Sequence, residues 1–118
     1  MVPRNVCIPV TEDGLIDPSW GRADRVAVAA IADGRIASWE ELVVGWGGLH
    51  DSAGEGEHHA RIARFLQTHD VQAVVAGHMG PPMQNMLAKM RIELHLGAAG
   101  PARDATLQAL AIPFDLTS

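Results

Sequence analysis

The chain has very little cysteine. Cys7 is its one thiol among 118 residues, so no internal disulfide can form, and a zinc or iron–sulfur site built only from cysteines is excluded. Cys7 lies inside an apolar run, VCIPV at residues 6–10, which favours a small buried hydrophobe over a lone thiolate ligand. Metal chemistry would therefore depend on other side chains, and the six histidines and five methionines are the first candidates.

Basic residues are also scarce. Nine Lys and Arg face fourteen Asp and Glu, which gives a formal net charge of −5, and no basic run occurs. A nucleic-acid-binding protein that relies on counterion release needs the opposite balance of charge. We therefore expect no nucleic-acid partner.

Long hydrophobic runs are missing as well. No stretch approaches the roughly 18 apolar residues of a membrane span, and the first ten residues, MVPRNVCIPV, lack the apolar core of a secretory signal. Hydrophobic residues nevertheless make up 47% of the chain, which is enough to bury a core. We expect a single domain over residues 1–118, without a membrane partner and located in the cytoplasm.

Several catalytic and nucleotide-binding motifs are absent. The chain has no GxxxxGK[ST], no GxGxxG, no HExxH and no CxxC. An enzyme that uses His78 as a general base is the least supported function, because the sequence offers no partner nucleophile or substrate pocket for it. We expect a binding protein and not an enzyme.

The hydrophobic pattern predicts an α/β fold with a five-stranded mixed sheet and three helices. Strands are expected near residues 6–10, 25–32, 35–44, 71–76 and 92–96, and helices near 57–69, 81–90 and 101–111. Asp33-Gly34 is typical of a tight hairpin, so the first three strands form an antiparallel meander. The two βα units that follow add parallel strands.

This order brings several loops to one end of the sheet. If the first, third, fourth and fifth strands point the same way, the loops that follow them share the carboxyl end, where ligands bind in open α/β sheets. Helices also begin there, and their positive N-termini favour an anionic ligand. These loops are residues 11–13, 20–25, 45–56, 77–82 and 97–101.

Imidazoles gather on these loops, and we predict four of them as metal ligands: His50, His58, His59 and His78. Adjacent helical residues diverge by about 100°. The alternative for His58-His59 is therefore a helix start with one ring packed and the other in solvent. Of the other two histidines, His69 is typical of a surface cap at a helix end, and His95 is ambiguous.

Methionines recur along one face of the helix expected near 81–90. Core packing explains Met86 and Met90, because Met fills irregular gaps well. Met79 and Met83 flank the turn before this helix, and for them both core packing and soft contact to a thiophilic metal or sulfide cluster stay open.

Two further side chains on the loop at 20–25 complete the candidate set. Trp20, like Trp46 on another loop, either shields a bound group or packs in the core. Arg22 supplies positive charge near the same end or is a surface residue in a salt bridge.

The order of several segments resembles a known family. The segments are CIPV before TEDG at 7–14, WGRA at 20–23, the Asp33-Gly34 hairpin, GHMGP at 77–81 and LGA at 96–98. Together they resemble the dinitrogenase iron–molybdenum cofactor biosynthesis family, in particular its small NifX/NafY-type domains, over most of the chain.

The resemblance implies a ribonuclease H-like fold without nuclease activity, and the binding or carriage of an iron/molybdenum–sulfur cofactor or its precursor. It also implies a cofactor-assembly protein as partner. The residues that match the family's cluster-binding segments by position are Arg22, His50, His58, His59 and His78. The family turn is often GGxGP, and His78 and Met79 depart from it in a way that enriches the turn in metal ligands.

The sequence therefore predicts a binding or carrier protein for a metal–sulfur cluster, a cofactor precursor or a metal ion at the carboxyl end of the strands. The cofactor-binding residues would be Trp20, Arg22, Met79 and Met83, beside the four histidines. The alternative is a protein-interaction or regulatory module that uses no metal.

Overall fold

The computed structural model of the protein describes residues 3–48 and 54–111. Five strands form one mixed sheet in the order β3-β2-β1-β4-β5. They are β1 (Arg4–Pro9), β2 (Arg25–Ala32), β3 (Arg35–Val43), β4 (Ala73–Val75) and β5 (Glu93–His95). β2 pairs antiparallel with β1 and β3, whereas β4 pairs parallel with β1 and β5. The predicted meander plus two parallel strands, in a ribonuclease H-like arrangement, is confirmed.

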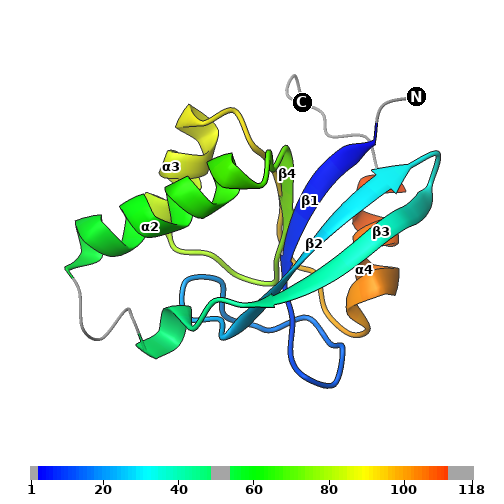
Figure 1. Ribbon diagram of the computed structural model, residues 1–118, viewed down its shortest axis with the longest axis horizontal. Helices are drawn as coiled ribbons and strands as arrows, with labels where there is room; N and C mark the ends of the chain where they lie inside the picture. The colour runs from blue at the N-terminus through cyan, green and yellow to red at the C-terminus, as the bar shows by residue number, and fades with distance from the viewer. Residues whose placement is uncertain (1–2, 49–53, 112–118) are drawn as a thin grey trace.

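Helices cover both faces of this sheet (Figure 1). α2 (Glu55–Thr68) and α3 (Pro81–Lys89) pack on one face, and α4 (Ala102–Ala111) packs on the other. Side chains alternate between the two layers, so that Cys7 and Val74 join the core under α2 and α3, while Val6 and Val75 join the core against α4. None of the helices within the described ranges has the length and apolar character needed to cross a bilayer.

Two turns carry the backbone conformations that their residues predict. Asp33 and Gly34 have φ values of 55° and 72°, as the tight hairpin between β2 and β3 requires. α2 ends at Thr68, and His69 is its C-cap, as predicted. Asp70 follows with φ 50°, and the Val71 N–H bonds to a carbonyl in the last turn of α2, at 2.9 Å. The chain therefore leaves α2 sharply and enters β4.

The prediction of a long loop at residues 45–56 is partly wrong. Residues 46–48 are helical and α2 already begins at Glu55, whereas residues 49–53 lie outside the described chain. The reason is Trp46, which is buried and packs edge-on against Trp20 and Phe65 with ring centroids 5.3 and 5.5 Å away. The buried Trp46 side chain thus holds residues 46–48 in place, although their glycines are typical of an open loop.

An ionic network ties the start of β1 to the edge strand β5. Glu93 Oε2 lies 2.7 Å from both Arg4 Nη2 and His95 Nε2, which gives the ambiguous His95 a structural partner. Burial raises the pKa of the Glu93 carboxyl, but the Arg4 guanidinium and the His95 imidazole outweigh burial and hold that pKa below its ordinary value of 4.5.

This pKa shift predicts how stability depends on pH. Because the folded-state pKa of Glu93 is depressed, its carboxylate stabilises the fold above the ordinary value, and that contribution is lost as pH falls through the folded-state value. Glu93→Gln should lower the free energy of unfolding by about 1 kcal/mol at pH 7. The gap in unfolding free energy between the parent protein and this variant should narrow as the pH falls toward roughly pH 3. Urea denaturation at both pH values measures this gap, with the exposed Glu40→Gln as control. A gap of equal size at both pH values would contradict the prediction.

Candidate functional site

A pocket of about 310 Å³ lies where β1 and β4 end and α2 and α3 begin, and we call it the rim pocket. Three segments far apart in the sequence form its wall: residues 18–22, residues 58–59 and residues 78–83. Seven of the eight predicted site residues line it, namely Trp20, Arg22, His58, His59, His78, Met79 and Met83. The eighth, His50, lies outside the described residues.

The rim pocket opens on the α2–α3 side of the sheet. The loop at 97–101, also expected at this end, does not line it. That loop crosses toward α4, where the Gly100 carbonyl accepts from the Ile16 N–H at 2.9 Å and the Gly14 carbonyl accepts from the Ala102 N–H at 2.8 Å. The N-terminus of α4 therefore contributes nothing to the pocket, although it lies at the same end of the sheet.

His58 holds two walls of the rim pocket together. Its ring is 1% exposed, and its Nε2–H donates to the Gly21 carbonyl at 2.6 Å. Arg61 Nη1 lies 3.5 Å from Nδ1 and can donate to it. Both ring nitrogens are thus engaged within the protein. His58 is the packed ring of the His58-His59 pair, and its role as a metal ligand stays a prediction.

The other imidazoles lie nearer to solvent. His59 is half-buried and His78 is exposed, and both line the pocket. Within residues 3–48 and 54–111, no three His, Cys, Asp or Glu side chains form a group that could hold a metal ion. The pocket therefore presents imidazoles around a space and does not present one tight site for a single ion.

Two thioethers form the buried side of the pocket. Met79 and Met83 are 2% and 6% exposed, and Gln84 Nε2 donates to the Met79 carbonyl at 2.7 Å, which fixes the turn before α3. α3 begins with Pro81 and Pro82, neither of which has an N–H group. The N-terminus of α3 therefore offers fewer backbone donors to an anion than the sequence reading assumed.

The charge of the rim pocket differs from that of the whole chain. No carboxylate is among the described residues that line it, and Arg22 is the one Lys or Arg side chain there. The chain as a whole carries a formal charge of −5. Among the described lining residues, Arg22 therefore supplies the one permanently charged side chain.

Three further sulfur atoms belong to the core. Cys7 is fully buried in β1, and burial raises the pKa of its thiol well above the ordinary value, so it stays protonated and is a poor metal ligand. Met86 and Met90 pack against the same core. The predicted core roles of these three residues are confirmed.

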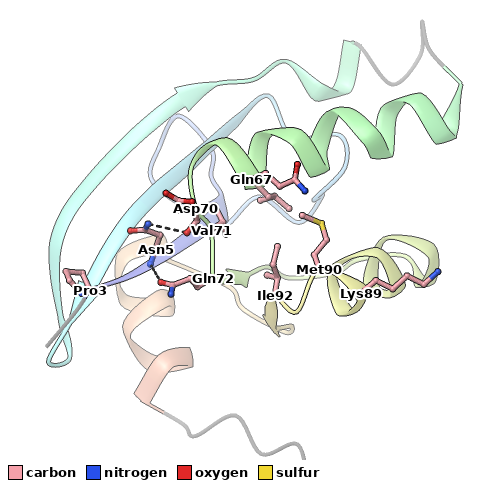
Figure 2. Close-up of a pocket in the computed structure, with 10 residues that line it drawn as sticks. Pro3, Asn5, Gln67, Asp70, Val71, Gln72, Lys89, Met90 and Ile92 are labelled. Carbon is pink, nitrogen blue, oxygen red and sulfur yellow. Dashed lines mark hydrogen bonds between the residues drawn. The ribbon is translucent and has the colours of Figure 1, made fainter.

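A larger cavity, about 820 Å³, lies at the opposite end of the sheet (Figure 2). Its polar groups already bond to one another: the Asn5 N–H donates to Gln72 Oε1 at 3.0 Å, and Asn5 Nδ2 donates to the Asp70 carbonyl at 3.2 Å. Lys89 extends away from these amides. No histidine or cysteine lines this cavity within the described chain, so the rim pocket remains the candidate site.

Two glycines in the site had no predicted role. Gly21 brings its carbonyl to His58, and Gly47 packs against the backbone of the loop that carries Arg22. A Cβ at Gly47 would lie 2.8 Å from the Arg22 carbonyl oxygen, which is closer than real contacts allow. The one feature of the sequence that could have indicated these roles is that each glycine directly follows a tryptophan, in WGRA and in WGG.

The His58–Gly21 bond predicts unequal effects of the two neighbouring histidines. His58→Ala should lower the free energy of unfolding by about 2–3 kcal/mol, because it removes a buried ring and leaves a carbonyl without its donor. His59→Ala, at a half-buried position, should cost less than about 1 kcal/mol. Chemical denaturation of both variants tests this, and equal losses would contradict the positioning role of His58.

The close packing at Gly47 predicts that alanine is tolerated less well at this position than at the neighbouring Gly48. Gly47→Ala should destabilise the protein by about 1–3 kcal/mol, because the new methyl group must displace the backbone at Arg22. Gly48→Ala is the matched control, since a Cβ there meets nothing within 4 Å. Thermal unfolding of the two variants provides the measurement. If Gly47→Ala were as stable as Gly48→Ala, residues 46–48 would not support the Arg22 loop as described.

Comparison with known proteins agrees with this architecture. The orange protein of Desulfovibrio gigas, in its apo form, superposes with a TM-score of 0.75 at 20% identity, over 96% of this chain and 93% of its own. PH0822 superposes with a TM-score of 0.71 at 17% identity, over 96% of this chain and 97% of its own. These likenesses show a shared fold, and no curated protein matches the chain in sequence. The family model described as dinitrogenase iron-molybdenum cofactor matches residues 4–111. The resemblance read from the sequence is thereby confirmed, and the chain belongs to the dinitrogenase iron–molybdenum cofactor family.

Proposed function

We propose that the protein is a carrier that binds an anionic metal–sulfur cluster, or a precursor of one, as cargo in the rim pocket. Members of its family are generally non-catalytic proteins of cofactor biosynthesis or carriage. The observation that carries the proposal is the convergence of Arg22, imidazoles and thioethers on a space whose described lining has no carboxylate. Such a lining favours an anion over a bare cation.

The donor types suit a metal–sulfur cargo. Thioethers are soft ligands that match thiophilic metals, and imidazole suits borderline metals. Met79 and Met83 supply the first type from the buried side, while His59 and His78 supply the second from the exposed side. Arg22 can donate several hydrogen bonds to sulfide or oxo groups at the surface of the cargo.

The size of the pocket favours a cluster over a single ion. About 310 Å³ is far more space than one metal ion fills, and no three His, Cys, Asp or Glu side chains form a group that could hold an ion among the described residues. A polynuclear or polyatomic anion can instead touch donors on several walls.

Trp20 adds a polar group without a partner. Its Nε1–H is buried and has no hydrogen-bond acceptor among the described residues, and its ring lines the pocket. A buried unsatisfied donor costs about 1–3 kcal/mol. A cargo that carries sulfide or oxo acceptors would supply the missing partner after a small movement of the ring.

The proposal is tested by anaerobic loading. The protein is incubated with tetrathiomolybdate and, separately, with iron, molybdate and sulfide together, then desalted and analysed for bound metal by mass spectrometry. We expect stoichiometric loading. His78→Ala, Met83→Leu and Arg22→Gln should each weaken binding about three- to tenfold, which is the loss expected for one ligand or one charged hydrogen bond.

Matched controls lie outside the rim pocket: His69→Ala, Met86→Leu and Arg64→Gln. These variants should load like the parent protein, and His50→Ala extends the series to the predicted ligand outside the described residues. Parallel loading with zinc and copper salts tests a bare ion. Absence of stoichiometric loading, or equal loading of pocket and control variants, would overturn the proposal and favour an interaction module without metal.

A further inference from the structure

One side of the backbone of the edge strand β5 has no strand partner within residues 3–48 and 54–111. β5 lies at the end of the sheet order, and of the described strands it pairs with β4 alone. Its bonds toward the β4 side involve residues 93, 95 and 97. They are Glu93 N–H to Gln72 O at 3.0 Å, Ala76 N–H to His95 O at 2.9 Å and Gly97 N–H to Gly77 O at 3.0 Å. Consecutive residues of a strand turn their backbone groups to opposite sides. The N–H and C=O of Leu94 and the N–H of Leu96 therefore face away from β4.

A groove runs beside this open edge. It has a volume of about 770 Å³, and its walls are α3, residues 91–92 between the helix and the strand, and the strand itself. Gln84, Asn85 and Ala88 line it from α3, whereas Leu94 and Leu96 line it from the strand side. Leu96 is 43% exposed. A helix packed beside an open strand edge is the arrangement that accepts an added strand in peptide-binding domains.

The lining of the groove carries one guanidinium, that of Arg91, and one carboxylate, that of Glu93. Glu93 lies 2.7 Å from both Arg4 and His95, so its charge is already paired. Arg91 is exposed and makes no ion pair with the described residues. A carboxylate on a bound chain would therefore complement Arg91, whereas Glu93 already has its partners.

The opposite edge of the sheet is protected. β3 carries the exposed Arg35, Glu40 and Glu41 along its nine residues, and charged side chains on an edge discourage strand addition. β5 also has two ionisable side chains, Glu93 and His95, but these bond to each other. The other residues of the strand and its flanks that line the groove are apolar: Ile92, Leu94 and Leu96. Of the two edges, β5 is therefore the one with an apolar groove beside it that another chain could enter.

We propose that the groove between α3 and β5 binds an extended, acidic peptide segment of a partner protein as an added strand. Its backbone would pair with the outward-facing groups of Leu94 and Leu96, its alternate apolar side chains would enter the groove, and an Asp or Glu carboxylate would meet Arg91. Gln84 links this groove to the rim pocket, because it lines the former and donates to the Met79 carbonyl in the latter. The inference does not depend on the cargo proposed above.

The test begins with a displayed library of random linear heptapeptides, selected on the protein and counter-selected on an Arg91→Glu, Leu96→Asp double variant. Surviving sequences should alternate β-branched residues with polar ones and contain Asp or Glu. A synthetic copy of one survivor is then titrated into ¹⁵N-labelled protein. We expect the amides of Leu94 and Leu96 to shift and to gain protection from hydrogen exchange.

Three comparisons decide the outcome. N-methylation of alternate peptide amides should weaken binding at least about tenfold, because it removes the strand hydrogen bonds. Arg91→Glu and Leu96→Asp should each weaken it about five- to tenfold. Val43→Asp, 74% exposed on the other edge, should change nothing. No surviving peptide, shifts centred elsewhere, or equal binding of the methylated peptide would overturn the proposal. A concentration-dependent dimer that Leu96→Asp abolishes would overturn it in favour of a second copy of the chain.

Discussion

The rim pocket depends on the hydrogen bond between the His58 ring and the Gly21 carbonyl. α2 is fixed by Ile62 and Leu66, which are fully buried against the sheet, and the β1–β2 loop is fixed by Trp20 in the same core. The bond from Nε2–H to the carbonyl, 2.6 Å long, joins these two units across 37 residues of sequence. Gly21 lies against both walls, since a Cβ there would be 3.8 Å from Nε2 of His58 and 4.0 Å from the Met83 methyl group, in ordinary van der Waals contact. One imidazole therefore sets the geometry in which the others are presented.

Charge is distributed so that this pocket stays free of carboxylates among its described residues. Glu93 is paired with Arg4, and Glu41 lies 3.7 Å from Arg25 on the meander side of the sheet. These two carboxylates are thus engaged by cations outside the rim pocket. At long range a net charge of −5 repels an anion, and at contact range Arg22 attracts it. Salt screens the long-range repulsion over about 10 Å, but it weakens the close attraction between Arg22 and an anion much less.

The sequence predicted the convergence of the site because the rule behind it is topological. Parallel strands end at the same edge, so His58, His78 and Met83 had to approach one another once β1 and β4 were paired. Other features depend on tertiary contacts that no local pattern contains. Trp46 makes a helical turn from a glycine-rich stretch, and the loop at 97–101 shares the correct end but crosses to the α4 face. His58 had two readings at the sequence level, and burial of its ring shows that it is the packed member of the pair.

The kind of donor in the rim pocket bears on how a carrier gives up its cargo. The one thiol of the chain, Cys7, is fully buried in β1 and protonated, so the pocket offers thioethers and imidazoles but no thiolate. Neutral ligands hold a thiophilic metal less tightly than thiolates do, because they contribute no charge to the bond. If the pocket holds a metal–sulfur cargo as proposed, a partner with free cysteines would draw that cargo from this protein, and the reverse transfer would be unfavourable. Because α3 forms a wall of both the rim pocket and the groove beside β5, a partner strand bound there would lie next to the turn that presents Met79. The partner's cysteines would then lie close to the cargo, and the thioethers and imidazoles of the rim pocket would hold it weakly. Both effects favour transfer to the partner, which is the physical requirement for one-way carriage.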